Sequence, residues 1–254
     1  MVVNAETPEY PALMELARER GFEFFAYGLS KGDIRCRSMK PTEDGWNLVL
    51  EVLGTEHSIV FPLIGSFQVE NALAALGLVI AGGMEYGYAA AALEALEGVP
   101  GRMEIVARLP SGARIIVDYA HTPDALKTIL MATRPHVGRR LTVVFGCGGD
   151  RDKVKRPEMG AIASELAENV IVTDDNPRYE DAGEIRKEIA AACPRCVEVA
   201  GRRDAIGVAI SELAEGDILI VAGKGHETGQ IIGDDVVPFS DSGVVRELAN
   251  RAAR

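Results

Sequence analysis

Four short runs of apolar residues occur in the second half of the chain, and none of them alternates with polar positions. They are residues 114–119 (RIIVDY), 141–145 (LTVVF), 170–173 (VIVT) and 217–222 (DILIVA). A continuous apolar run of this length is typical of a strand buried on both faces, as in a parallel sheet covered by helices. We therefore predict that these four runs are strands of one parallel sheet.

Amphipathic stretches of helical length separate the four runs. The first begins at Thr122-Pro123-Asp124, which supplies a capping hydroxyl, a first-turn proline and a first-turn acid for a helix reaching about Arg134. Strands that alternate with helices are typical of a doubly wound α/β domain. Further helices are predicted over residues 157–168, 183–192, 203–214 and 242–253.

The first 100 residues follow a less regular pattern. Residues 46–52 and 57–63 alternate in polarity, as a half-exposed hairpin does. The predicted strand at 2–4 has no element before it, as if this half were only the later part of a domain. We therefore expect residues 1–101 to lack strand partners and to be less stable than the rest. Helices are predicted over residues 8–20, 67–81 and 88–96.

Each predicted strand of the second half ends in a polar or glycine-rich segment. These segments are Tyr119–His121, Gly146–Arg151, Asp174–Arg178 and Gly223–Glu227. In open α/β sheets, ligands bind outside the carboxyl ends of the strands. The four segments should therefore meet at one crevice, which is the predicted site.

Composition and charge narrow the classes of function. The chain has 254 residues, of which 47% are hydrophobic and 26% charged, as in a soluble globular protein. Its formal charge of −11, with 38 acidic and 27 basic residues and no basic block, predicts no nucleic-acid partner and no anionic membrane surface. No apolar segment is long enough for membrane insertion, so the cytoplasm is the expected location. The four cysteines, including the pair in Cys193-Pro-Arg-Cys196, are expected to be ordinary reduced thiols.

Glycines follow the second predicted strand in Gly146-Cys-Gly-Gly-Asp-Arg151-Asp-Lys153. Glycines at a strand exit allow backbone N–H groups to approach an anion closely. The alternative is a tight turn with solvated charges. No G-x-x-x-x-G-K-[ST] phosphate loop occurs within the 254 residues.

The exit of the third strand reads Asp174-Asp175-Asn176-Pro177-Arg178. An arginine held here by a stiff turn suits a planar carboxylate, because its fixed fork donates two parallel hydrogen bonds. The alternative is a capped turn without a binding role.

Histidines and an acid in the other exits are weaker candidates. His226 and Glu227 of Gly223-Lys-Gly-His-Glu227 could form an acid/base pair, although binding of a ligand ammonium by Glu227 is favoured. His121 could be a metal ligand, but a lone histidine beside a helix cap is more often structural.

Six motifs, taken in order, resemble those of the Mur ligases, and within them the ligases that add meso-diaminopimelate. They cover roughly residues 60 to 245 and comprise GSFQVENALAA at 65–75, GRME at 101–104, DYAHTPD at 118–124, residues 146–157, DNPR at 175–178 and GKGHE at 223–227. The resemblance implies a C-terminal Rossmann-like ligase domain at residues 102–254. Residues 1–101 would then be the second half of a central ATP-binding domain.

The resemblance also assigns binding residues by position. Asn71 falls where the family contacts adenine, and Arg102 and Asp118 fall at positions that help to hold ATP. Gln68 departs from the asparagine more usual after Phe67, and the family's uridine-nucleotide domain, phosphate loop and carbamylated lysine would all precede residue 1. The implied meso-diaminopimelate site consists of Arg151, Asp175, Asn176, Pro177, Arg178, Gly223 and Glu227.

For the intact enzyme the resemblance implies a monomeric ligase that uses ATP and magnesium. It would convert the D-glutamate carboxylate of UDP-MurNAc-L-Ala-D-Glu to an acyl phosphate, which the amine of meso-diaminopimelate attacks. This chain alone is expected to be inactive. Two alternatives stay open, a non-catalytic amino-acid-binding module and a related ligase such as a folylpolyglutamate synthetase.

Overall fold

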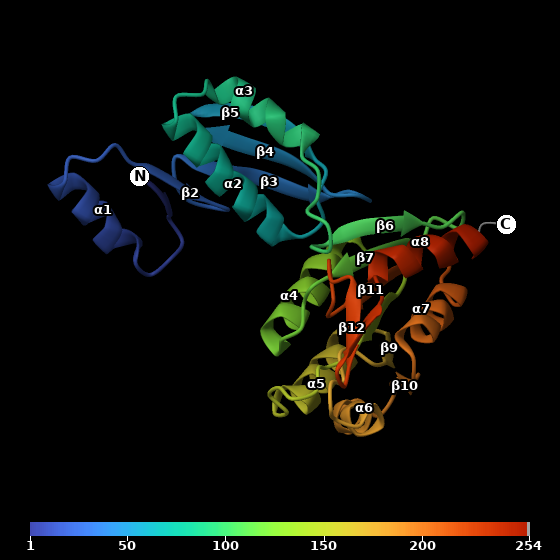
Figure 1. The fold of residues 1–254 in the computed structure, drawn as a ribbon. Coiled ribbons are helices and arrows are strands. Elements are labelled where there is room, and N and C mark those ends of the chain that lie inside the picture. Colours follow the sequence, from blue (N-terminus) through green and yellow to red (C-terminus); the bar gives the residue numbers. More distant parts are fainter. Residues whose placement is uncertain (253–254) are drawn as a thin grey trace. The chain divides into compact units, whose positions relative to one another are not determined.

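The computed structural model describes residues 1–252, and the chain forms two compact units (Figure 1). The first unit comprises Met1–Glu97 and the second begins at Gly98. Each has its own sheet, its own helices and its own hydrophobic core.

The second unit is built on a six-stranded sheet in the order β10-β9-β8-β11-β7-β6. Only the β6–β7 pair is antiparallel, and every residue of β7, β8 and β11 is buried. The prediction of buried parallel strands is confirmed for all four apolar runs, which are β7, β8, β9 and β11. The strands are β6 (Glu104–Arg108), β7 (Arg114–Asp118), β8 (Leu141–Phe145), β9 (Asn169–Val172), β10 (Val197–Glu198) and β11 (Ile218–Ala222).

Helices cover both faces of this sheet, so the predicted doubly wound class is confirmed (Figure 1). Helices α4, α5 and α6 pack in a row on one face, and α7 and α8 pack on the other. Thr122 caps α4 as predicted, since its hydroxyl accepts a hydrogen bond from Ala125 N at 3.3 Å. The helices are α4 (Pro123–Thr133), η2 (Arg134–His136), α5 (Lys155–Leu166), α6 (Ala182–Ala190), α7 (Arg202–Ser211) and α8 (Asp241–Ala252).

The strand order brings the four polar exits together. From β7 the chain crosses to β8 and then moves outward to β9 and β10, before it returns to place β11 between β8 and β7. The carboxyl ends of β9, β8, β11 and β7 are therefore consecutive along one edge of the sheet. Ligands of doubly wound domains bind at such an edge.

A small antiparallel hairpin, β12 (Gly229–Ile232) and β13 (Asp235–Pro238), follows the last exit. It was not predicted. Arg178 forms an isolated parallel bridge with Ile232, which joins the hairpin to the exit of β9. The hairpin thus holds the exit of β9 in place.

The first unit has a five-stranded sheet in the order β1-β2-β3-β4-β5. The predicted hairpin is confirmed, since Trp46 of β4 pairs with Phe61 of β5. The expectation that residues 1–101 lack strand partners is wrong, because β2 and β3, which the sequence pattern did not reveal, join β1 to this hairpin. Its strands are β1 (Val2–Asn4), β2 (Phe25–Gly28), β3 (Ile34–Pro41), β4 (Trp46–Val52) and β5 (Thr55–Phe61).

The helices of the first unit supply one side of its core. Leu73 and Leu76 of α2 are buried with Ile34, Leu50 and Phe61 of the sheet. Burying apolar side chains in this way is the main stabilising contribution to a fold. The helices are α1 (Tyr10–Glu19), α2 (Ser66–Ala81), α3 (Tyr86–Ala92) and η1 (Leu93–Ala95).

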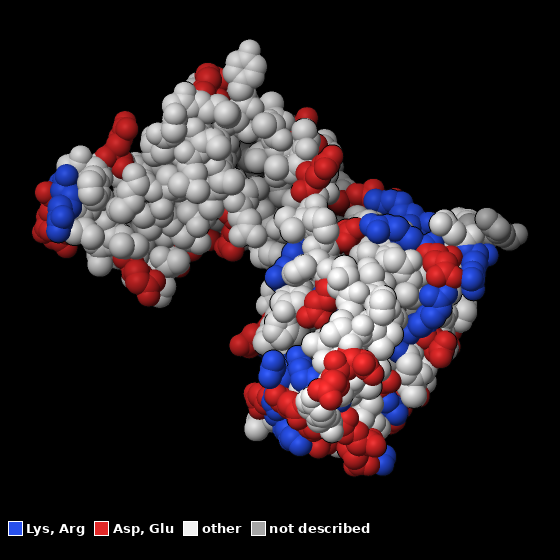
Figure 2. All heavy atoms as spheres, in the orientation of Figure 1, with Lys and Arg blue, Asp and Glu red and all other residues white. Residues whose placement is uncertain are grey.

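Charged side chains are mixed on the surface of the second unit. On the face drawn in Figure 2, lysines and arginines lie among aspartates and glutamates rather than in a block of one sign. Several form exposed ion pairs, such as Arg203 with Glu247 at 2.6 Å. A search of residues 1–252 for a helix with the length and apolarity of a membrane span finds none.

Candidate functional site

The four strand exits line one cavity of about 390 Å³. The crevice predicted from the strand order is therefore present. Of the predicted site residues, Pro177 is buried behind the wall. The others that the resemblance gave to the amino acid site line the cavity, namely Arg151, Asp175, Asn176, Arg178, Gly223 and Glu227.

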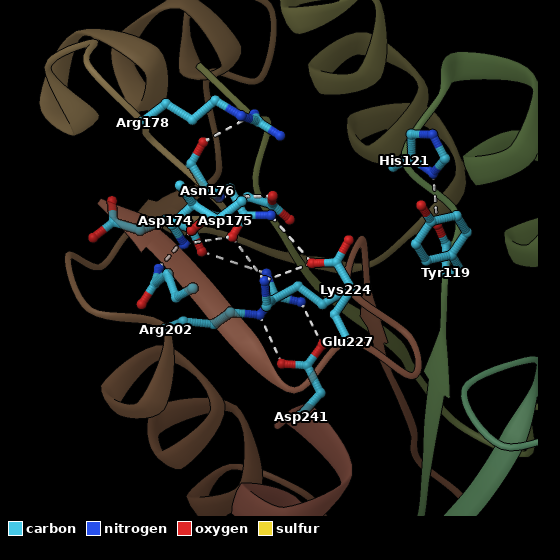
Figure 3. Close-up of polar contacts among 12 residues, drawn as sticks. Tyr119, His121, Asp174, Asp175, Asn176, Arg178, Arg202, Lys224, Glu227 and Asp241 are labelled. Atoms are coloured by element: carbon cyan, nitrogen blue, oxygen red, sulfur yellow. Dashed lines mark hydrogen bonds and ion pairs between the residues drawn. The ribbon is translucent and has the colours of Figure 1, made fainter. Parts of the chain in front are cut away.

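The turn after β9 is held in an unusual backbone conformation. Arg178 has a φ of 53°, in the left-handed region that few residues other than glycine adopt. Its backbone N–H donates to Ile231 O at 3.1 Å, and its Nη1 donates to Gly149 O at 2.8 Å. The β12 strand and the glycine loop thus hold the guanidinium at the cavity (Figure 3).

Glycines after β8 allow the loop that contains them to touch the turn after β9. Gly149 N donates to Asn176 O at 2.9 Å, and a Cβ on Gly149 would lie 1.9 Å from Pro177 O. A Cβ on Gly146 would lie 2.3 Å from Thr173 O. These glycines are therefore required for close contact between two loops, a role that the sequence pattern did not reveal.

Replacing Gly149 with alanine should push the two loops apart. The added methyl group has to move backbone rather than a flexible side chain, and overpacking of this kind costs about 1–3 kcal/mol. We expect a lower midpoint of thermal unfolding and weaker ligand binding, measured by calorimetry. Gly207→Ala in α7 is the matched control, because the nearest atom to its added Cβ is Leu248 Cδ1 at 3.8 Å. That change should stabilise the helix by up to about 1 kcal/mol, and equal behaviour of the two variants would contradict the contact role of Gly149.

Lys224 is a fully buried charge next to the cavity, with 0% of its side chain exposed. It donates to Asn176 Oδ1 at 2.9 Å and to Glu227 Oε2 at 2.8 Å, and Asn176 Nδ2 donates to the same Glu227 oxygen at 3.1 Å (Figure 3). Burial raises the pKa of Glu227, but the hydrogen bonds from Lys224 and Asn176 outweigh it and hold the pKa below the ordinary value. Glu227 is therefore a carboxylate at neutral pH. No role for Lys224 is evident from the sequence.

A second buried ion pair holds the site from behind. Arg202 of α7 and Asp241 of α8 are both fully buried and pair at 2.7 Å through two parallel hydrogen bonds. Arg202 also donates to Ala222 O at 2.8 Å, directly before Gly223. The pair fixes the carboxyl end of β11 to both helices of that face.

Two of the three residues expected near ATP lie close to the exit of β7, Asp118 as the last residue of that strand and Arg102 just before β6. The Arg102 guanidinium lies over the Tyr119 ring, 4.5 Å from its centroid, and stays exposed. Asp118 accepts hydrogen bonds from Met103 N at 2.8 Å and Ala120 N at 2.7 Å, and burial raises the pKa of its carboxyl group against them. Arg102 is thus available to a ligand, whereas both carboxylate oxygens of Asp118 already accept hydrogen bonds from backbone N–H groups.

Asn71, the third residue expected near ATP, lies in α2 of the first unit. Its side chain is exposed, and its Nδ2 donates to Gln68 Oε1 at 3.3 Å. An exposed amide can hydrogen-bond to a base edge.

The cavity offers charges of both signs but no activated nucleophile. Arg151, Lys155 and Arg178 face it together with Asp175 and Glu227. Cys147 also lies in the wall, but burial raises the pKa of its thiol to about 12, so the thiol is protonated and unreactive at neutral pH. The site is equipped to bind a zwitterion rather than to form a covalent bond with it.

Family comparisons match both units. A family described as the Mur ligase middle domain matches residues 1–79, and one described as the Mur ligase glutamate ligase domain matches residues 101–225. A Caulobacter vibrioides protein named UDP-N-acetylmuramoyl-L-alanyl-D-glutamate–2,6-diaminopimelate ligase is 48% identical over 94% of the chain and 49% of its own length. A Rhizobium meliloti protein of the same name is 53% identical over 91% of the chain and 48% of its own length. The chain spans about half the length of the curated relatives it matches.

Solved structures show the same likeness. One described as a UDP-N-acetylmuramoyl-L-alanyl-D-glutamate–2,6-diaminopimelate ligase superposes with a TM-score of 0.78 at 33% identity, over 100% of this chain and 53% of that one. A Mycobacterium tuberculosis folylpolyglutamate synthase superposes with a TM-score of 0.68 at 22% identity, over 100% of this chain and 55% of that one. The second match is a likeness of fold alone.

Proposed function

Because the chain belongs to the Mur ligase family, we propose that it is part of an ATP-dependent ligase that adds meso-diaminopimelate to UDP-MurNAc-L-Ala-D-Glu. In this proposal the second unit binds the incoming amino acid and the first is part of the ATP-binding domain. The enzyme would act as a cytoplasmic monomer on small molecules. The names of its relatives support the choice of substrates.

The observation that carries the proposal is the charge pattern of the cavity. Meso-diaminopimelate has two carboxylates and two amino groups. Arg151 and Arg178 lie in the wall to pair with carboxylates, and Glu227, ionised at neutral pH, lies there to pair with an ammonium. Both carboxylates and one ammonium of the ligand thus have an opposite charge within one cavity.

The chain's own contribution to the reaction is to orient the attacking amine. ATP, when bound, supplies the phosphoryl group that activates the glutamate carboxylate. The amine nitrogen then forms a bond to the carboxyl carbon, phosphate leaves and the amine loses a proton. Holding the amine at the right distance turns a bimolecular encounter into a local one, which contributes about 7–11 kcal/mol in favourable systems.

The chemistry of Arg102 and that of Asn71, each considered within its own unit, suits a nucleotide. Arg102 is an exposed cation held on Tyr119, and Asn71 is an exposed amide. Within residues 1–252, no three His, Cys, Asp or Glu side chains are grouped so that they could hold a metal ion. We therefore assign no metal ligands to this chain.

A second candidate function is amino acid binding without catalysis. It rests on the lack of a G-x-x-x-x-G-K-[ST] phosphate loop among the 254 residues, since that loop supplies the backbone cradle and lysine for phosphates. In either case this chain by itself should bind the amino acid but not turn over ATP.

Calorimetry and a phosphate-release assay on the 254-residue chain test the proposal together. We expect saturable binding of meso-diaminopimelate, much weaker binding of L-lysine, and no ATP- and dipeptide-dependent phosphate release above a heat-treated control. Lack of amino acid binding would overturn the assignment of the cavity. Phosphate release would show that the chain holds a complete phosphate site.

A further inference from the structure

Lys224 lies behind the cavity wall rather than in it. Its side chain is fully buried and is not among the residues that line the cavity, whereas its two partners, Asn176 and Glu227, both are. Burying an ammonium group is costly unless it is paired and hydrogen-bonded. Its effect on a bound ligand must therefore pass through those two partners.

The contacts of Asn176 fix which way its amide group faces. Its Oδ1 accepts from Lys224 Nζ at 2.9 Å and from Ile231 N at 3.0 Å. Both partners donate hydrogen bonds, so the oxygen cannot be exchanged with the nitrogen by a flip of the amide. One N–H of Nδ2 donates to Glu227 at 3.1 Å, which leaves the second N–H for the cavity.

The contacts of Glu227 divide its two oxygens in a similar way. Oε2 accepts from both Lys224 and Asn176. Among residues 1–252, no hydrogen-bond donor contacts Oε1, and the side chain is 34% exposed. The carboxylate thus keeps one oxygen for a ligand.

We propose that Lys224 is a positioning residue that fixes the polarity of the amino acid site. By holding Asn176 Oδ1 and Glu227 Oε2, it leaves a donor at Asn176 and an anionic acceptor at Glu227. A donor beside an anion matches the carboxylate and ammonium carried by one carbon of an amino acid. This inference rests on the proposed function for the nature of the ligand, but not for the arrangement of the three side chains.

Lys224→Met tests the arrangement without any ligand. With the ammonium gone, two of the contributions that offset the burial of Glu227 are lost and only those of Asn176 and Arg178 remain, so its pKa should rise from its lowered value. Carbon-13 NMR of the labelled carboxyl group measures this titration. The side-chain N–H signals of Asn176 should also lose their protection from hydrogen exchange, because Oδ1 loses one of its two donors.

Lys187→Met is the matched control. Lys187 pairs with Glu184 on the surface of α6, and both side chains are 66% exposed. The same change of charge and shape there should leave the Glu227 titration and the Asn176 signals as in the wild type. An unchanged Glu227 titration in Lys224→Met would overturn the proposal, whether or not the chain binds the amino acid.

The pH dependence of binding gives a second readout that a merely structural lysine would not change. A carboxylate with a lowered pKa stays ionised as the pH falls. Protonation of Glu227 should therefore have little effect on the wild-type affinity for meso-diaminopimelate between pH 8 and pH 5. In Lys224→Met the higher pKa brings protonation of the carboxyl group closer to that range, so the loss of affinity relative to wild type should be larger at pH 5 than at pH 8. A loss that is the same at both pH values would show that Lys224 only supports the fold.

Other charged groups around Glu227 are present in wild type, variant and control alike, so each comparison differs by one lysine. They come from every segment packed around the carboxylate. They are Asp175 and Arg178 after β9, Arg202 at the start of α7, Arg151, Asp152 and Lys155 after β8, Tyr119 and His121 after β7, and the adjacent His226.

A double variant covers the case in which Lys224→Met does not fold. Removing one partner of a buried pair leaves an uncompensated charge, whereas Lys224→Met/Glu227→Gln leaves none. The double variant should fold, and its Asn176 N–H signals should still lose protection. Asn176 signals as protected as in the wild type would show that Ile231 alone fixes the amide, and that Lys224 does not position it.

Discussion

Replacing Arg178 with alanine should weaken binding of meso-diaminopimelate by roughly 30-fold to several thousand-fold, and that of L-lysine hardly at all. The two amino acids differ by one distal carboxylate. Truncating one member of a buried charged pair costs about 2–5 kcal/mol, at about 1.4 kcal/mol for each tenfold change. A site built for a polar group also rejects an analogue that lacks it more strongly than an apolar pocket does.

The structure supports this role through the way Arg178 is held. Its Nη1 is committed to Gly149 O at 2.8 Å and its backbone to Ile231 O at 3.1 Å, so the guanidinium is oriented before any ligand arrives. A guanidinium that needs no reordering loses little conformational freedom on binding. Arg178 is thus suited to select for a carboxylate.

Calorimetry with both ligands, on wild type and on Arg178→Ala, measures the effect. Arg203→Ala is the control, since it removes the same charge from the exposed ion pair of Arg203 with Glu247 of α8. Equal losses for both ligands would assign Arg178 to the shared carboxylate or to the fold. If neither ligand loses affinity, the segment is a capped turn without a binding role.

Replacing Arg202 with methionine should lower the free energy of unfolding of the second unit by about 3–5 kcal/mol, because Asp241 is left as a buried charge without its partner. Both members of the pair are fully buried, and Arg202 also binds Ala222 O at the start of the last exit. The neighbouring Arg203→Met should cost at most about 1 kcal/mol, as its ion pair is exposed. Two adjacent arginines thus differ severalfold in their effect.

Amide hydrogen exchange in β11 reports the stability of the second unit within the whole chain. Exchange there should become faster in Arg202→Met and stay near the wild-type rate in Arg203→Met. Arg202→Met/Asp241→Leu should regain much of the loss, because no buried charge is left unpaired. Similar exchange rates in the two single variants would mean that the buried pair contributes no more than a surface pair.

The sequence predicted the central strands and their shared edge because their signals are local. The runs that became β7, β8 and β11 are apolar throughout, and they proved to be buried at every position. In β3 the signal is broken, because a register shift between Cys36 and Ser38 interrupts the alternation of polarity. The β12–β13 hairpin did have a local signal, since Gly233-Asp234 follows two isoleucines and can form a two-residue hairpin turn.

The residues of the site likewise fall into those whose role is indicated by the neighbouring sequence and those whose role depends on contacts with distant segments. Arg178 and Glu227 could be proposed from the segments that contain them. Lys224 could not, because a lysine in a polar segment is normally solvated, and its burial depends on Asn176, 48 positions earlier in the chain. The role of Gly149 likewise depends on the carbonyl of Pro177, which approaches it only in the folded chain.

The hairpin that follows the last exit has a consequence for the order of folding. Its Ile231 N and Gln230 Nε2 hydrogen-bond to Asn176 and Asp175, across 55 positions of sequence. Contacts between segments so far apart close a long loop, which slows their formation relative to local pairing. During synthesis the turn after β9 leaves the ribosome well before the strand that fixes it. The cavity should therefore be among the last parts of the second unit to form, after its sheet is already in place.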